Sequence, residues 1–223
     1  MVDAMRIDIW SDVACPWCYV GKRNLETALA ELDLEVDIRW RAYELDPDAP
    51  TTTSLSMAEV LSRKYGVSLD EAATMNANMT RVAERAGLEY HLDDLKLGNS
   101  FDAHRLAKLA EEHDLGDEAA EALFSAYFTQ GRSIAAHDSL IEIGTSIGLE
   151  KGEIEAMLAS DAFADEVRGD EALAAEAGFN GVPTFVVDGS FAIPGAQPAD
   201  TFVRLLGKMA SGDTSDFTPD GSS

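Results

Sequence analysis

The feature that most constrains this chain is Cys15-Pro16-Trp17-Cys18, which holds its only two cysteines. The motif follows an alternating stretch over residues 7–10 and precedes an apolar pattern of helical spacing. A cysteine at a helix start lies among unpaired backbone N–H groups, at the positive end of the helix dipole, which favours the thiolate. Pro16 suits the first helical position, where its missing N–H removes no hydrogen bond. The pair can cycle between dithiol and disulfide, which predicts thiol–disulfide exchange.

Two other interpretations of the cysteine pair are weaker. Half of a zinc site would need further ligands, but no second Cys-x-x-Cys exists. The four histidines also lack close ligand spacing, so no metal site is predicted; they are His91, His104, His113 and His137. An inert disulfide across so short a loop would remove little chain entropy. We therefore favour a redox-active pair.

The net charge of −24 comes from 41 acidic and 17 basic residues spread along the chain. Such a surface repels nucleic-acid phosphates and anionic membranes, so neither partner is expected. The chain carries no apolar run long enough to cross a bilayer. The start, Met1 to Met5, lacks the parts of a signal peptide, and we expect a cytoplasmic protein. Dispersed acidity also suggests a halophilic source, because salt would screen the self-repulsion.

Hydrophobic periodicity divides the chain into three parts. A strand, a helix ending near Asp33 and a strand over 36–42 predict a βαβ unit with a parallel pair. From Asp46-Pro47 to about Gly178 the spacing is helical. Within that block, two capping boxes predict helix starts: Ser56-x-x-Glu59 and Ser68-x-x-Glu71.

Strand character returns near the end of the chain. Strands over 184–187 and 190–193 flank Asp188-Gly189, the dipeptide favoured in a two-residue hairpin turn. A last helix is expected from Pro198, and the polar tail over 212–223 is expected to be disordered. The predicted order is βαβ, a helical block, then ββα.

This order, with Val182-Pro183-Thr184 before the hairpin, resembles a thioredoxin fold interrupted by helices. More specifically, the chain resembles the DsbA-like family, in the FrnE-like branch of cytoplasmic dithiol–disulfide oxidoreductases related to 2-hydroxychromene-2-carboxylate isomerases. The resemblance implies an α/β protein with a discontinuous thioredoxin-fold domain over 1–48 and 179–211 and an all-helical insertion domain over 49–178. It rests on five ordered motifs, which are residues 11–23, Tyr43-Glu44-Leu45-Asp46-Pro47, Asn99-Ser100-Phe101-Asp102-Ala103-His104-Arg105-Leu106, Gly181-Val182-Pro183 and Gly195-Ala196-Gln197-Pro198.

The resemblance assigns roles around the cysteines. Cys15 would be the exposed nucleophile and Cys18 the less accessible resolving thiol. Pro183 would be cis and face the pair, turning the backbone of Val182 toward an extended substrate strand. Pro16 and Trp17 would adjoin the substrate, with Trp17 packing beside the site rather than reacting. One departure is Thr184, which stands where many relatives carry an aromatic residue.

The insertion motif would place Asn99, His104 and Arg105 over the active-site groove. Arg105 could hold a substrate carboxylate, and His104 could transfer protons or stabilise the thiolate. The same two residues could equally brace helices. Asp8 and Asp37, on expected strands, are equal candidates for the acid that handles the proton of Cys18.

The sequence thus predicts a dithiol–disulfide oxidoreductase for protein or small-molecule thiols, with its redox direction open. No bound cofactor is expected, glutathione is a candidate co-substrate, and the protein would be a monomer or homodimer. One alternative is a glutathione-dependent isomerase or transferase of an aromatic or polyketide-like substrate. The isomerase relatives typically carry serine in place of Cys15, so two cysteines favour redox chemistry. A second alternative is a non-catalytic, thiol-based metal-binding or chaperone-like protein.

Overall fold

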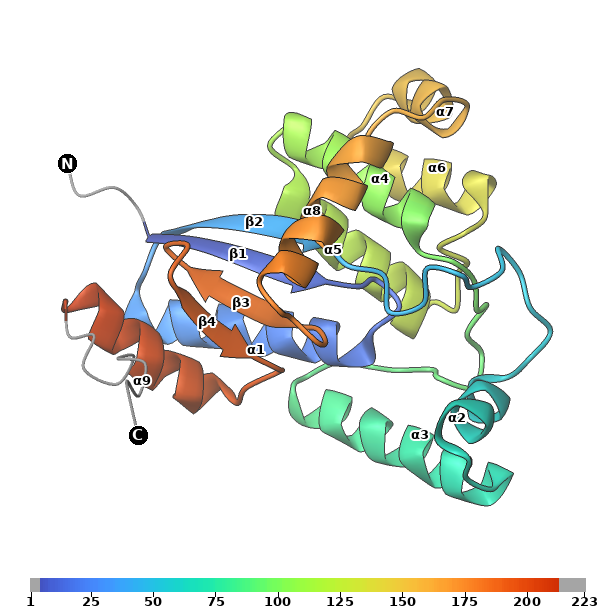
Figure 1. Ribbon diagram of the computed structural model, residues 1–223, viewed down its shortest axis with the longest axis horizontal. Helices are drawn as coiled ribbons and strands as arrows, with labels where there is room; N and C mark the ends of the chain where they lie inside the picture. The colour runs from blue at the N-terminus through green and yellow to red at the C-terminus, as the bar shows by residue number, and fades with distance from the viewer. Residues whose placement is uncertain (1–4, 213–223) are drawn as a thin grey trace.

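The computed structural model describes residues 5–212, and within this range the strands form one mixed sheet of order β2-β1-β3-β4 (Figure 1). The strands β1 (Met5–Ser11) and β2 (Val36–Ala42) pair in parallel, as predicted. β3 (Thr184–Val187) runs antiparallel to both β1 and β4 (Phe191–Pro194). The hairpin between β3 and β4 turns at Asp188 and Gly189, whose φ angles of 48° and 65° confirm the predicted turn.

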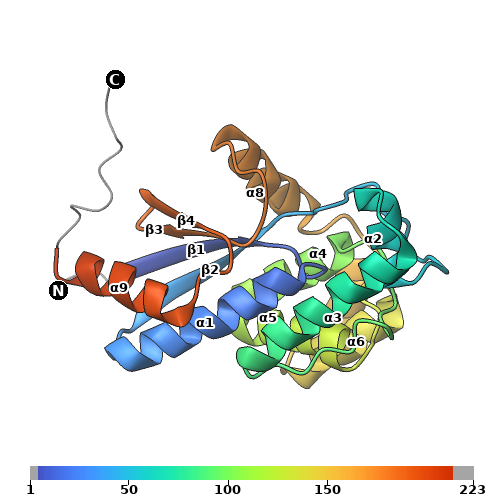
Figure 2. The ribbon, with the colours of Figure 1, turned by 90° about the horizontal axis from the view of Figure 1, so that it is seen from below.

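Helices cover both faces of the sheet. α1 (Pro16–Leu32) and α9 (Ala199–Ala210) lie on one face, and α8 (Ala164–Glu176) lies on the other (Figure 2). α1 starts with Cys15 at its N-cap and Pro16 in its first turn. It ends at Asp33, whose left-handed backbone stops the helix where the sequence predicted.

The segment between β2 and β3 is helical, as the periodicity predicted. Both capping boxes form, so Ser56 and Ser68 open their helices with reciprocal bonds to Glu59 and Glu71. The π-helical turn η1, which extends α5, was not predicted. The elements before α8 are α2 (Met57–Tyr65), α3 (Leu69–Arg85), α4 (Phe101–Glu112), α5 (Gly116–Phe124), η1 (Ser125–Thr129), α6 (His137–Ser146) and α7 (Lys151–Leu158).

One hydrophobic core runs from the sheet into the helical segment. Its fully buried members include Ile7 and Phe185 on strands and Leu106 and Phe128 on helices. The chain therefore buries apolar surface on both sides of the boundary predicted near residue 48, and the division into two domains stays a prediction. The tail predicted to be disordered lies, apart from Gly212, outside the described residues.

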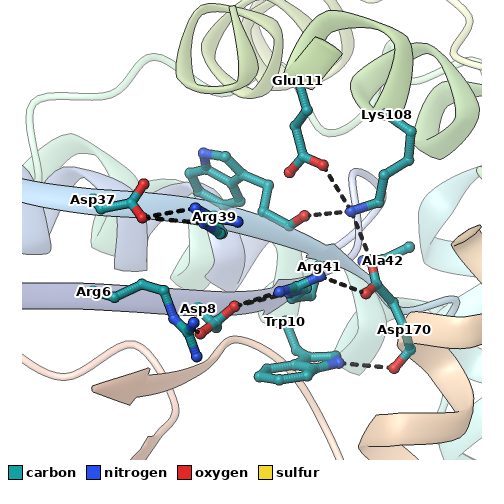
Figure 3. A network of polar contacts seen from close by, with 11 residues as sticks. Arg6, Asp8, Trp10, Asp37, Arg39, Arg41, Ala42, Lys108, Glu111 and Asp170 are labelled. Atoms are coloured by element: carbon teal, nitrogen blue, oxygen red, sulfur yellow. Dashed lines mark hydrogen bonds and ion pairs between the residues drawn. The ribbon is translucent and has the colours of Figure 1, made fainter. Parts of the chain in front are cut away.

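The free edge of β2 is closed by side chains from two helices (Figure 3). The backbone N–H of Ala42 donates to the Asp170 carboxylate of α8 at 3.0 Å. The backbone carbonyl of Trp40 accepts from Lys108 Nζ of α4 at 2.8 Å. Lys108 and Asp170 also form a buried ion pair at 2.7 Å. The edge groups of β2 thus find partners within the chain, so this part of the edge is not open to another strand.

Asp170 also contacts side chains of β1 and β2, the two strands that carry the network in Figure 3. Its carboxylate contacts Arg41 at 3.1 Å, and its backbone carbonyl accepts from Trp10 Nε1 at 2.9 Å. Arg41 then pairs with the buried Asp8 at 2.7 Å. One residue of α8 therefore fastens β1, β2 and α4 together.

Replacing Asp170 with asparagine should lower the free energy of unfolding by about 3 kcal/mol, because Lys108 and Arg41 lose the carboxylate that they share. Urea denaturation in high-salt buffer measures this change. The matched control is Glu112→Gln at the exposed end of α4, which should change stability by less than about 0.5 kcal/mol. Small, equal effects of both substitutions would contradict the role given to the network.

Candidate active site

The start of α1 holds both cysteines, and both are free thiols. The backbone N–H of Cys15 donates to the carbonyl of Asp12 at 3.0 Å, and that of Cys18 to the carbonyl of Cys15 at 3.0 Å. These bonds form the turn that carries the chain from β1 into the helix. The structure therefore places the pair at a helix N-terminus, as its spacing predicted.

The expectation of an exposed Cys15 is wrong for this structure, because Cys15 is only 3% exposed and Cys18 is 1% exposed. The thiol of Cys15 donates to the backbone carbonyl of Val182 at 3.6 Å, so the loop before β3 lies over it. The peptide bond between Val182 and Pro183 is cis, as the resemblance implied. A substrate that pairs with the Val182 carbonyl would have to replace the Cys15 thiol there.

A close approach of α1 to this loop depends on Gly21. A Cβ atom at Gly21 would lie 3.0 Å from the Pro183 side chain and 3.1 Å from that of Phe185. A larger residue here would therefore require the Pro183 and Phe185 side chains to shift by a few tenths of an ångström. Gly21 therefore sets the distance between the two segments that bring Cys15 and Val182 together.

Cys18 lies in an environment that keeps it protonated. Burial raises the pKa of the Cys18 thiol well above its ordinary value, and the neighbouring Cys15 raises it further. The Ser11 hydroxyl and the backbone N–H of Asp12 act in the opposite direction without cancelling this effect. Cys18 is therefore a thiol at neutral pH and must lose a proton before it can act as a nucleophile.

A buried carboxylate, Asp12, lies directly beneath the motif. Its side chain accepts from the backbone N–H groups of Ala14 at 2.9 Å and Leu45 at 2.7 Å. His104 Nε2 lies 3.6 Å from the same carboxylate. Burial alone would raise the pKa of Asp12, but His104 and the two N–H groups outweigh it and lower the pKa. Asp12 is thus an ionised group within the core.

The sequence pointed to other acids. Asp8 is committed to Arg6 and Arg41, and Asp37 pairs with Arg39 on the surface. Among the described residues, neither carboxylate forms a hydrogen bond or ion pair with Cys15 or Cys18, so the structure gives neither acid a direct contact with the cysteines. The signal that could have identified Asp12 is its place three positions before Cys15, where the strand turns into the helix.

Tyr90 connects the helical segment to the motif, and the sequence did not single it out. Its hydroxyl donates to the backbone carbonyl of Pro16 at 2.7 Å. Its ring stacks on the rings of Tyr19 and Phe128, with distances between ring centroids of 6.1 Å and 4.8 Å. Burial raises the pKa of Tyr90, and the cysteines raise it further, so Tyr90 stays a neutral donor. Trp17 next to this contact is 46% exposed and offers an apolar surface beside Cys15.

The residues predicted over the groove separate into two groups. Asn99 accepts from the N–H of Phe101 at 2.8 Å and donates to Glu44 at 2.9 Å, so it opens α4 against the segment after β2. Arg105 is buried and donates to the carbonyl of Ala162 at 2.8 Å and to Asp102 at 2.7 Å. The donors of Arg105 are thus taken by partners within the chain, which matches the bracing alternative and leaves no exposed guanidinium for a substrate carboxylate. His104 alone of the three lies against the site, through Asp12.

Residues 5–212 contain neither a cluster of metal ligands nor a membrane-spanning helix. No group of three His, Cys, Asp or Glu side chains in this range could hold a metal ion. No helix in the same range is long and apolar enough to cross a membrane.

Comparison with known proteins gives a consistent family. The model of the DSBA-like thioredoxin domain family matches residues 6–207. The crystal structure of a probable DsbA oxidoreductase from Streptomyces coelicolor is 39% identical, with a TM-score of 0.87 over 98% of this chain and 94% of that one. The uncharacterized protein YwbO of Bacillus subtilis (strain 168) is 28% identical over 206 residues, 91% of this chain and 96% of its own.

A more distant structure shares the fold. The cytosolic disulfide reductase DsbM from Pseudomonas aeruginosa with GSH is 21% identical, with a TM-score of 0.67 over 92% of this chain and 99% of that one. At 21% sequence identity, this similarity shows that the two proteins share a fold and nothing more.

In a Cys15→Ser variant, iodoacetamide should alkylate Cys18 far more slowly in the native protein than in urea. Burial of Cys18 both blocks the reagent and raises the pKa of the thiol, so the thiolate is scarce at neutral pH. The native rate should therefore keep rising as the pH passes the range in which the unfolded cysteine is already ionised. Mass spectrometry of quenched samples gives both rates. Equal rates in buffer and urea would contradict the environment described for Cys18.

Tyr90→Phe should lower the free energy of unfolding by about 1 kcal/mol, because the Pro16 carbonyl loses its donor. Tyr65→Phe is the matched control, since the Tyr65 ring is 56% exposed at the end of α2. Urea denaturation of both variants measures the difference. A loss of the same size in the control would remove the case for the Tyr90 contact.

Proposed function

Because the chain belongs to the DsbA-like thioredoxin domain family, we propose that it catalyses dithiol–disulfide exchange through Cys15 and Cys18. The observation that carries this proposal is the placement of two free thiols at the start of α1, with Cys15 Sγ 3.6 Å from the carbonyl of Val182. A thiol at a helix N-terminus beside a main-chain carbonyl is suited to forming a mixed disulfide.

The reaction proceeds in two displacements. The Cys15 thiolate attacks a substrate disulfide, one substrate sulfur leaves as a thiolate, and Cys15 is joined to the other. Cys18 then loses its proton and attacks the Cys15 sulfur, which forms the Cys15–Cys18 disulfide and releases the second substrate thiolate. Two electrons pass from the protein to the substrate. The reverse steps oxidise a substrate dithiol.

The exposed surface around the pair supports binding of a substrate chain. Trp17 offers an exposed ring in the turn after Cys15, and Leu45 is 41% exposed on the segment held by Asp12. The Val182 carbonyl is the main-chain acceptor available once the Cys15 thiol is displaced. An extended segment carrying a cysteine would therefore place apolar side chains on Trp17 and Leu45.

The finer assignment is part of the same proposal. We assign the chain to the FrnE-like branch of cytoplasmic oxidoreductases, acting on protein or small-molecule thiols without a resident cofactor and as a monomer or homodimer. Glutathione is proposed as co-substrate, and the fold likeness to a disulfide reductase described with GSH supports testing it first. The charge of −24 supports a halophilic source, because high salt would screen it.

The test is a redox titration of the purified protein in glutathione buffers of high ionic strength, with alkylatable thiols counted by mass at each ratio. Two thiols should disappear together along a reversible two-electron curve. Cys15→Ser should abolish turnover of a disulfide substrate, and Cys18→Ser should stop at a mixed disulfide. The midpoint relative to the cytosolic glutathione poise then gives the direction of the reaction.

Two other results would overturn the proposal. Thiols that stay free at every accessible ratio, with an activity that needs glutathione and survives Cys15→Ser, would indicate an isomerase or transferase. Stoichiometric metal retained through gel filtration, with no turnover of disulfides, would indicate a thiol-based binding protein.

A further inference from the structure

The hairpin of α2 and α3 has an uncovered surface. α2 is the one helix within residues 5–212 that has no buried residue. It packs on α3, and Figure 1 places both helices at the edge of the molecule, away from the sheet. Six large apolar side chains are exposed in the same range, and three of them lie on this hairpin: Tyr65, Leu69 and Met75. Exposed apolar side chains that gather on one element indicate a surface that another molecule covers.

The same hairpin is electrically neutral in a strongly acidic chain. Residues 57–85 hold four acidic and four basic side chains, so the rest of the chain carries the whole net charge of −24. The charged residues are Glu59, Asp70, Glu71 and Glu84, with Arg63, Lys64, Arg81 and Arg85. Two copies of such a molecule repel one another, and the repulsion is weakest where neutral faces meet. A second copy can therefore approach this hairpin at little electrostatic cost.

The outward face of α3 carries charges in an order that is complementary to itself. One side of the helix holds the buried residues Ala72, Met79 and Ala83. Side chains on the opposite side are all exposed, and they are Asp70, Thr74, Ala77, Asn78, Arg81 and Arg85. Asp70 lies in the first turn and Arg85 in the last. If two such helices pack antiparallel about a two-fold axis, Asp70 of each copy lies beside Arg85 of the other.

The helix dipole explains part of this charge order, because acidic residues stabilise the start of a helix and basic residues its end. The chain does not apply that rule generally. Among the described α-helices, basic residues occupy the last turn only in α2, α3 and α9. Four of its 17 basic residues lie on this one hairpin. The placement thus calls for a second explanation, and a contact with the opposite charge supplies it.

We propose that two copies of this chain associate through the outward face of α3, in an antiparallel contact with Ala77 and Asn78 at the two-fold axis. The small Ala77 side chain lets the two helices approach closely. Tyr65 and Leu69 of each copy would lie toward the last turn of α3 in the other. The inference does not depend on the proposed function, because no cysteine takes part in the contact.

The available area sets the strength of this contact. α3 has 17 residues and is therefore about 25 Å long. Two helices side by side are about 20 Å wide, so the hairpin offers about 500 Å² per copy. The total of about 1,000 Å² is at the low end for specific interfaces. We therefore expect a weak dimer that exchanges with the monomer, and one that screening of the net charge by salt strengthens.

The experiment is sedimentation velocity of the full chain over a series of concentrations, in high-salt buffer with dithiothreitol to prevent disulfides between copies. Asp70→Arg and Arg85→Asp each put like charges together at both ends of the contact, and each should weaken dimerisation by about tenfold. An equimolar mixture of the two variants restores both opposite-charge pairs in the mixed dimer. The mixture should therefore dimerise as the unmodified protein does.

Asp165→Arg is the matched control, since Asp165 is also exposed in the first turn of a helix, α8, and the substitution changes the charge equally. It should leave dimerisation unweakened. Recovery in the mixture also guards against a folding defect, because mixing two damaged chains does not repair either one. A monomer at every concentration would overturn the inference and leave the hairpin as a surface for a different protein. A dimer insensitive to both reversals, or a mixture that stays monomeric, would overturn it as well.

Discussion

The arrangement of this protein depends on one buried carboxylate, Asp170, which completes the open edge of a short sheet. The outer edge of β2 would otherwise present unpaired backbone groups, and Asp170 with Lys108 supplies their partners. Because Asp170 is on α8 and Lys108 on α4, the same contacts dock two helices that are distant in sequence. Removing a buried partner leaves the other charges uncompensated, so the network acts as a unit.

The docking of these helices also decides what surrounds the cysteines. α4 carries His104 to the Asp12 carboxylate, and the segment after α3 carries Tyr90 to the carbonyl of Pro16. On the other side, the loop before β3 carries Val182 over Cys15. The helical segment is thus part of the site, and it supplies the polar contacts that the start of α1 cannot make alone.

Local signals in the sequence located most of the elements correctly. These signals depend on interactions within a few residues. They are the start of α1 at Pro16 and its end at Asp33, the two capping boxes, and the Asp188-Gly189 turn. Predictions that depended on residues far away in the sequence were less accurate. The guanidinium of Arg105 could bind a substrate carboxylate on chemical grounds. In the structure it donates instead to backbone carbonyl groups of the segment after α7. The exposure of Cys15 depended on a loop more than 160 residues away.

By itself, the sequence determined the order of the elements, the helix-terminal position of the Cys15–Cys18 pair and the family resemblance. These follow from periodicity, caps and short motifs, whose physics is local. Only the tertiary structure decided that Asp12, rather than Asp8 or Asp37, is the carboxylate beneath the motif, and that both thiols are buried. The reason is that burial and charge pairing are set by which segments meet in space, and one sequence does not encode that meeting in any local pattern.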